Sequence, residues 1–282
     1  MMSNMKTKRN IVLAHFILAV VAGFLCVAAF AGCDAKSAVK TGDAQKTEIS
    51  AAEKAETPES EREKGLAALR KKDYKTAVGH FTAAAEQGDA MAQNMLALCY
   101  ETGQGVKQDY AQAAKWYRKA ADQGYADAQL NLGGCYEQGH GIGQDYAEAV
   151  KWYRKAADQG LIEAQVILGN CYETGTGVKQ DYKQAAGWYR KAADQGNDVA
   201  LLRLGNCYLE GTGVKKDAKQ AVKLFRKAAD QGSDVAQLVL GNCYYNGWGV
   251  KKSNAEAVKW YRKAAEQGNA LAKEALKKLG AE

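Results

Sequence analysis

The chain has 282 residues, of which 47% are hydrophobic, and it contains one proline and 29 glycines. Its formal net charge is +7, and three of the basic residues lie within the first nine positions. Basic and acidic residues are mixed along the remainder. Nucleic-acid binding is therefore not indicated, because it needs a concentrated basic surface.

The first 32 residues have the features of a secretory signal. Basic residues precede an apolar run from Ile11 to Phe30, and Ala31-Gly32-Cys33 follows it. A positive start, an apolar stretch and small residues before a cleavage point are typical of such signals. Cysteine directly after Ala-Gly resembles a bacterial lipoprotein signal, although Phe30 replaces the usual leucine. In that family the peptide is cut before the cysteine, so the resemblance implies that Cys33 carries a lipid.

Two alternatives remain for this segment. The apolar run of about 20 residues is long enough to stay uncut and span a bilayer. A plain cleaved signal is the other alternative. A lipid anchor or an uncut span would hold the chain on a membrane outside the cytoplasm, so we expect a bacterial envelope protein facing the periplasm. Asp34 resembles a retention signal of some Gram-negative lipoproteins, which favours the inner membrane over the outer one.

Residues 33–60 are expected to form the lipidated cysteine and a flexible tether. From Ala35 to Ser60 the sequence is mostly Ala, Lys, Glu, Thr and Ser, with almost no large apolar side chain. Such a segment buries too little surface to offset the entropy lost on ordering. The charged stretch 59–64 is already compatible with a helix. We therefore place the folded domain at residues 61–282.

The folded domain repeats every 36 residues. Glycines, cysteines and tryptophans each keep this step, with Leu224 in one tryptophan position. The members are Gly88, Gly124, Gly160, Gly196, Gly232 and Gly268; Cys99, Cys135, Cys171, Cys207 and Cys243; and Trp116, Trp152, Trp188 and Trp260. A fixed period of this length indicates stacked structural repeats that bury one continuous core.

The sequence of each repeat unit predicts an antiparallel pair of helices. In the unit that begins at Tyr125, apolar residues three and four apart predict a first helix, and Gly139 is placed to end it. Asp145 then lies at the N-cap of a second helix. Equivalent caps are Asp109, Asp181 and Asp217. Gly133 recurs inside the first helix at a cost of about 1 kcal/mol relative to alanine, which predicts close packing against a neighbouring helix.

The repeated pattern resembles the Sel-one-like repeat, a relative of the tetratricopeptide repeat. The pattern is Ala-x-x-x-Leu-Gly-x-x-Tyr-x-x-Gly-x-Gly-Val, then Asp-x-x-x-Ala-x-x-Trp-Tyr-x-Lys-Ala-Ala-x-x-Gly, in five copies between Asp89 and Gly268. Residues 65–88 resemble a shorter opening pair, and residues 269–279 a capping helix. The resemblance implies an all-α, right-handed α-solenoid of about six antiparallel helix pairs plus a C-terminal capping helix. Its inner surface would bind other proteins.

The cysteines, histidines, glycine loops and aromatic pairs are all better explained by structural roles than by chemical ones. Each unit has one cysteine, and equivalent helices lie about 8–10 Å apart, too far for a disulfide. We therefore expect five free, buried thiols. The three histidines have no nucleophile or acid that the repeat places beside them, so we expect no catalytic residues, no metal site and no cofactor. The Gly-x-Gly loops fit turn geometry better than phosphate binding, and the Trp-Tyr pairs fit core packing.

Positions that vary between otherwise similar first helices predict the binding site. In the family that the repeat resembles, the first helix lines the concave face. The predicted partner-binding residues are Met95, Asn131, Ile167, Asn170, Arg203, Asn206, Val239, Asn242 and the loop residue Trp248. Asn170, Asn206 and Asn242 are 36 residues apart and would hydrogen-bond a peptide backbone, since an amide both donates and accepts. The alternative is that these asparagines satisfy nearby helix-end groups.

These features together predict a membrane-anchored extracytoplasmic scaffold. It would bind a protein or peptide partner in its concave groove and would act as a monomer. The alternative is a binding module for cell-wall glycan or a small ligand. An enzyme is not expected.

Overall fold

The computed structural model describes residues 57–281, whose regular secondary structure is entirely helical. The helices are α2 (Pro58–Arg70), α3 (Tyr74–Glu86), α4 (Ala90–Thr102), α5 (Tyr110–Asp122), α6 (Ala126–Gln138), α7 (Tyr146–Asp158), α8 (Ile162–Thr174), α9 (Tyr182–Asp194), α10 (Asp198–Glu210), α11 (Ala218–Asp230), α12 (Asp234–Asn246), α13 (Asn254–Glu266) and α14 (Ala270–Lys278). This is the predicted right-handed solenoid of six pairs and a capping helix.

The N-terminal boundary differs slightly from the expectation. Helix α2 begins at Pro58, with the Thr57 side chain accepting a hydrogen bond from the Ser60 backbone N–H. Proline in the first turn and a threonine cap both favour a helix start here. Residues 58–60, assigned to the tether, are therefore helical. The signal segment, Cys33 and Asp34 lie outside the described residues.

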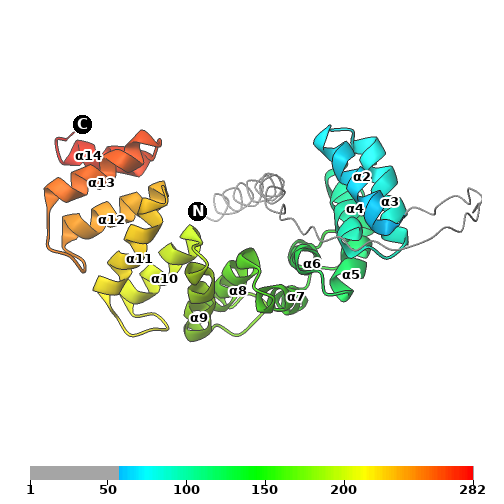
Figure 1. Ribbon diagram of the computed structural model, residues 1–282. Helices are drawn as coiled ribbons and strands as arrows, with labels where there is room; N and C mark the ends of the chain where they lie inside the picture. Colours follow the sequence, from blue (N-terminus) through cyan, green and yellow to red (C-terminus); the bar gives the residue numbers. More distant parts are fainter. Residues whose placement is uncertain (1–56, 282) are drawn as a thin grey trace, which may run out of the picture. The chain divides into compact units, whose positions relative to one another are not determined.

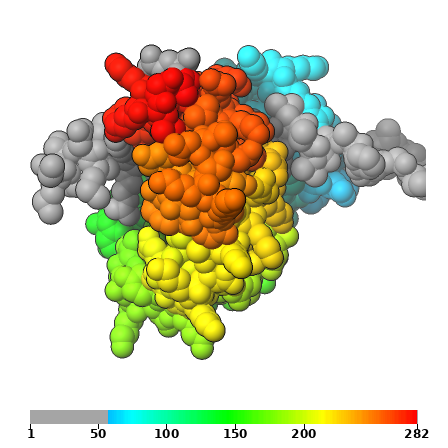
Figure 2. All heavy atoms as spheres, turned by 90° about the vertical axis from the view of Figure 1, so that its left-hand side faces the viewer, coloured from blue at the N-terminus to red at the C-terminus, as the bar shows by residue number. Residues whose placement is uncertain are grey.

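The helices stack in chain order. Each one packs mainly against the helices before and after it, and the contacts within a pair are more extensive than those between pairs. In Figure 1 the pairs of the solenoid follow an arc, with α6 and α8 on its inner side and α7 and α9 on its outer side. Figure 2 shows the C-terminal end of the stack, where α14 in red lies on α13 in orange. The first helices of successive units thus form an inner layer.

Local signals set the helix boundaries as the sequence predicts. The Asp145 side chain accepts a hydrogen bond from the Glu148 backbone N–H at 2.9 Å, and Asp109, Asp181 and Asp217 cap their helices in the same way. The glycines that follow α4, α6, α8, α10 and α12 have φ between +73° and +82°, where a β-carbon is unfavourable. These signals recur in each unit, so the units have the same geometry.

The glycine inside each first helix makes room for an aromatic ring. A β-carbon on Gly169 would lie 2.6 Å from a ring carbon of Tyr189, on the second helix of the same unit. Three further pairs repeat this contact: Gly133 with Tyr153, Gly205 with Phe225, and Gly241 with Tyr261. The close helix approach predicted from the sequence is therefore confirmed, and its partner is the ring.

Polar side chains join neighbouring units. Gln129 donates to the Ala121 carbonyl at 3.2 Å and accepts from Gln159 at 2.7 Å. The guanidinium of Arg118 donates to the Tyr136 hydroxyl of the next unit. Both bonds recur at most of the other junctions. Because buried amides are costly when unpaired, these bonds fix how one unit sits on the next.

The core runs through the stack between the two layers. The five cysteines of the repeat are buried, as predicted. Trp152, Trp188 and Trp260 are 4–6% exposed, which confirms their core packing. Within residues 57–281, none of the helices combines the length and the apolar character that crossing a bilayer requires.

We expect Gly169→Ala to destabilise the solenoid, because the new methyl group overlaps the Tyr189 ring. Overpacking of this kind costs about 1–3 kcal/mol. The matched control is Gly187→Ala on the exposed face of α9, where a β-carbon meets nothing within 4 Å. This control should gain up to about 1 kcal/mol from helix propensity. Urea unfolding followed by circular dichroism measures both, and equal midpoints for the two variants would contradict the packing argument.

Candidate functional site

The predicted partner-binding residues lie on the inner layer but differ in exposure. Arg203 and Asn206 on α10 are exposed, and Trp248 in the loop after α12 is 46% exposed. The half-buried members are Asn131, Ile167, Asn170, Val239 and Asn242. The inner layer is therefore open mainly at α10 and at the loop after α12.

Met95 is the exception, and the structure corrects its assignment. It is only 8% exposed and belongs to a hydrophobic cluster with Phe81 and Leu96. Burying a methionine side chain stabilises the fold by about 1.5–3 kcal/mol, so this residue packs between α4 and the opening pair. It is not available as a groove residue.

The asparagines of the inner layer divide into two kinds. Asn131 donates to the Asn94 side chain at 3.0 Å, and Asn242 accepts from the Tyr261 hydroxyl at 2.8 Å. These two amides bond side chains of other helices and are therefore occupied, although neither bonds a helix-end group. The side chains of Asn170 and Asn206 have no hydrogen bond with any described residue. Only these two amides are therefore free, within residues 57–281, to bind a peptide backbone.

Trp248 differs from its counterparts in the other loops. His140 occupies the equivalent position and stacks on Tyr110, with 4.4 Å between the ring centroids. The loop of Trp248 lies over Ala218 instead, since the backbone at Gly249 contacts the Ala218 carbonyl. Without a tyrosine at position 218, the indole has no such ring to stack on. The indole is exposed, and its role in contacting a partner stays a prediction.

A repeated tyrosine–glutamate hydrogen bond links the two layers, and sequence reasoning missed it. The Tyr117 hydroxyl donates to Glu101 at 2.6 Å, and the Tyr153–Glu137 and Tyr189–Glu173 bonds repeat it at 2.7 and 2.5 Å. Burial, with the nearby carboxylate, raises the pKa of these tyrosines, so each hydroxyl keeps its proton. In the next unit Phe225 and Leu209 replace both partners. The sequence shows that the tyrosine and the glutamate are replaced together, and this was the signal that could have revealed the pair.

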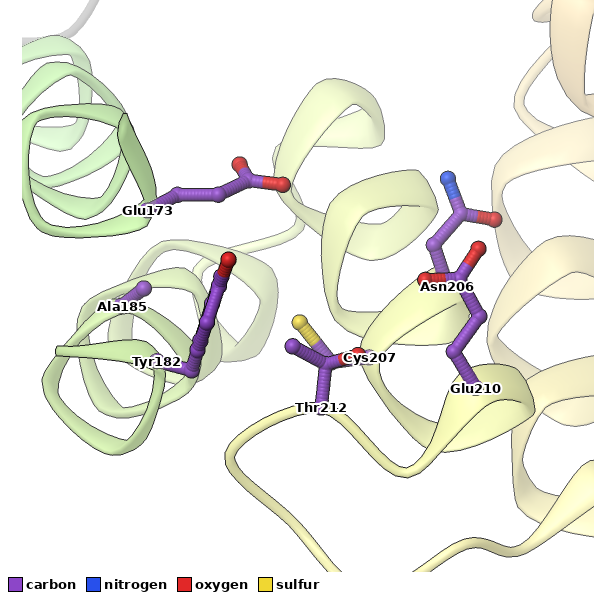
Figure 3. A pocket seen from close by; sticks show the side chains of 7 residues that line it. All are labelled: Glu173, Tyr182, Ala185, Asn206, Cys207, Glu210 and Thr212. Carbon is purple, nitrogen blue, oxygen red and sulfur yellow. The ribbon is translucent and has the colours of Figure 1, made fainter. Parts of the chain in front are cut away.

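A pocket of about 340 Å³ lies between two consecutive units of the solenoid. Figure 3 shows its lining side chains, which come from α8, α9, α10 and the loop after α10. They are Glu173, Tyr182, Ala185, Asn206, Cys207, Glu210 and Thr212. Arg203 adds a cation 3.8 Å from a carboxylate oxygen of Glu173. Of this set the sequence predicted only Asn206 and Arg203 as site residues, because the other side chains meet only across units.

The pocket has no composition suited to a metal ion. Within the described residues, no group of three or more His, Cys, Asp or Glu side chains is placed to hold one. The two carboxylates, one amide and one phenol ring suit a cationic or hydrogen-bonding group instead.

Comparison with known protein families identifies the repeat. The Sel1 repeat matches six times, at residues 62–89, 90–125, 126–161, 162–197, 198–233 and 234–269. The chain belongs to the Sel1 repeat family. Sel1 repeat proteins generally mediate protein–protein interactions and are typically not catalytic. A comparison with curated proteins finds no significant match.

Two solved Sel1 structures are similar over most of the chain. One is c5321, a protective antigen of uropathogenic Escherichia coli, with 40% identity and a TM-score of 0.75 over 77% of this chain. The match covers 48% of that protein, so this chain spans about half its length. The other is a Sel1 repeat protein of Oxalobacter formigenes, with 39% identity and a TM-score of 0.69. That match covers 75% of this chain and 84% of the other.

The buried cysteines of this Sel1 solenoid are poorly reactive. Burial raises the pKa of Cys99, Cys207 and Cys243 to about 11 and that of Cys135 to about 12, from an ordinary value of 9.0. A thiol reacts through its thiolate, so such groups are poor nucleophiles at neutral pH. They act as small apolar side chains of the core.

We expect the five repeat thiols to react slowly in the folded protein at pH 8. A pKa of 11 in place of 9 lowers the thiolate fraction about a hundredfold, and burial adds steric protection. The measurement is the rate of a chromogenic disulfide reagent with Cys26 and Cys33 replaced by serine. All five thiols should react quickly in urea, and a fast phase in the folded protein would contradict this account.

The same shifts predict a loss of stability at high pH. The unfolded chain releases thiol protons near pH 9, whereas the folded chain retains them to about pH 11. The contribution is therefore complete below pH 9 and is lost as the pH rises through 11. Replacing Cys99 and Cys243 by alanine should make urea midpoints fall less steeply between pH 9 and 11, and an unchanged slope would argue against buried neutral thiols.

Proposed function

We propose that this Sel1 repeat protein binds a segment of another protein along its inner helices. The observation that carries the proposal is the open inner layer at α10, where Arg203 and Asn206 are exposed and a pocket lies beside them. The outer helices keep a nearly constant sequence, whereas the inner positions change from unit to unit. Variation confined to one face of a repeat is expected where that face recognises a particular partner.

The same proposal includes a membrane anchor. The basic start, the apolar run and the Ala-Gly-Cys sequence support lipidation of Cys33, after which residues 34–57 would connect the solenoid to the bilayer. A chain of about 24 residues reaches up to about 80 Å when extended, so the inner layer would be accessible to soluble and membrane-bound partners. The protein would act as a monomer facing the periplasm, and Asp34 favours the inner membrane.

The alternative is binding of cell-wall glycan or a small ligand. Tyr182 is 42% exposed beside the carboxylates and amide of the pocket. An aromatic ring next to hydrogen-bonding groups also suits a sugar. Sedimentation with purified peptidoglycan, with no other protein present, separates this alternative from protein binding.

Capture of partners from the membrane fraction tests the groove. We expect Asn170→Ala with Asn206→Ala to lose the partner by about tenfold or more, since these two amides of the inner layer have no side-chain hydrogen bond within the described residues. Lys223→Ala on the exposed side of α11 is the control and should leave capture unchanged. Equal recovery with all variants would count against the inner layer as the binding surface.

Metabolic labelling tests the anchor. We expect radioactive palmitate to be incorporated into the mature protein and the label to disappear in Cys33→Ala, because the cysteine sulfur is the proposed attachment point. The same substitution should move the protein out of the membrane fraction if the signal is still cleaved. Cys26→Ala is the matched control, and labelling that survives Cys33→Ala would exclude this lipid site.

A further inference from the structure

The two layers of the solenoid carry opposite charge. The first helices α4, α6, α8, α10 and α12 contain eight acidic residues and one basic residue. The second helices α5, α7, α9, α11 and α13 contain 16 basic and seven acidic residues. Because the layers alternate along the chain, the overall charge conceals this separation. A ligand on the inner layer meets a negative surface.

The acids of the inner layer are concentrated on its N-terminal half. Glu101, Glu137 and Glu173 lie at equivalent positions near the ends of α4, α6 and α8. Each accepts a tyrosine hydroxyl, which holds its carboxylate in place. Asp127 and Glu163 form a second acidic pair at the starts of α6 and α8. The one cation on these five helices is Arg203, at the C-terminal edge of the acidic half.

The same two columns become apolar in the C-terminal half. Leu209 and Tyr245 continue the first column. The second column continues as Val199, Val235 and Leu271, which are 45%, 49% and 63% exposed. Three large apolar side chains so exposed, 36 residues apart on consecutive first helices, form a stripe with no partner among the described residues. Such stripes often mark interaction sites.

Three residues depart from this division of the inner layer into an acidic half and an apolar half. Met91 occupies the second column in α4, so the acidic half is complete only from α6 onward. Asp198 and Asp234 precede two of the exposed valines, but Asp234 accepts a hydrogen bond from Asn269 and Asp198 from the Val199 backbone N–H. Their carboxylates are engaged locally, and the exposed surface beside them is apolar.

The pocket lies where the acidic half meets the apolar half. Glu173 and Glu210 supply carboxylates to its lining, and Tyr182 and Ala185 supply apolar surface (Figure 3). A lysine or arginine side chain combines an apolar stem with a charged end. Its stem fits the apolar surface, and its charge fits the carboxylates. The pocket therefore suits one basic side chain of a partner.

We infer that the inner layer binds an extended protein segment that has basic residues at one end and apolar residues at the other. The inference rests on the proposed function and specifies the chemistry of its partner. The basic residues lie on α6 and α8, one enters the pocket, and the apolar residues lie on the stripe of Val199, Val235 and Leu271. Neighbouring first helices are about 10 Å apart, and an extended chain rises about 3.3 Å per residue. Contacts therefore recur about every third residue of the partner.

A designed peptide tests this pattern with the full-length protein in detergent micelles. The probe is a fluorescein-labelled peptide of about 18 residues. Lysine occupies every third position of one half, leucine every third position of the other, and glycine and serine fill the rest. One control peptide replaces lysine by glutamate, and a second replaces leucine by serine. Fluorescence anisotropy should show at least about tenfold tighter binding of the probe than of either control at low salt. The preference over the glutamate peptide should weaken at high salt.

Charge-reversal variants locate the binding. Glu163→Lys with Glu210→Lys should weaken probe binding by about tenfold or more and improve binding of the glutamate peptide. Neither side chain has a hydrogen bond or ion pair to another side chain of the described residues, so circular dichroism should stay unchanged. Asp158→Lys with Asp194→Lys makes the same charge change on exposed positions of α7 and α9 and should have no effect. Val235→Ser with Leu271→Ser should remove the advantage of leucine over serine.

Two results overturn the inference. One is equal binding of the lysine and glutamate peptides. The other is an equal effect of the inner-layer and outer-layer charge reversals, which would place the probe elsewhere. If the natural partner is still lost with Asn170→Ala and Asn206→Ala, the proposed function stands and only the partner chemistry is wrong. Capture that is insensitive to those two substitutions defeats the proposed function itself.

Discussion

The contact between a glycine and an aromatic ring sets the geometry on which the rest of the solenoid depends. At Gly133, Gly169, Gly205 and Gly241 the ring of the second helix occupies the space of a β-carbon. Only this residue type lets the two helices of a pair approach so closely. Each glycine makes its helix less stable than alanine would, and burial of the whole aromatic ring offsets this cost. The repeated distance within each pair then allows the pairs to stack regularly.

The ring that fills this space also connects the core to the inner face. In two units it belongs to a tyrosine, Tyr153 or Tyr189, whose hydroxyl extends past the glycine to a glutamate; Tyr117 makes the same bond opposite Ala97. The core therefore positions a carboxylate on the surface that faces a partner. Phe225 keeps the packing contact but has no hydroxyl, and the inner face at Leu209 is apolar. One change in the core thus accompanies a change of surface chemistry.

Several predictions about the binding surface depended on knowing which helix faces are exposed to solvent. Met95 and Asn170 follow the same surface-facing pattern in the sequence, yet Met95 is buried against the opening pair and Asn170 is half-exposed. Asn206 and Asn242 are equivalent in sequence, but Asn242 accepts a hydrogen bond from Tyr261, whereas Phe225 can offer none to Asn206. Equivalent positions differ because their neighbours on other helices differ, and a repeat pattern read along the chain does not show those neighbours.

The sequence by itself determined the all-α solenoid, its unit length, the helix caps and the burial of the repeat cysteines and of Trp152, Trp188 and Trp260. These follow from local spacing, since caps, glycine turns and apolar stripes act within about one or two helical turns. The tertiary structure alone decided the ring beneath each glycine, the tyrosine–glutamate bonds and the pocket between α8 and α10. These features join residues 16 to 39 positions apart, and only the packing of whole helices brings such residues together.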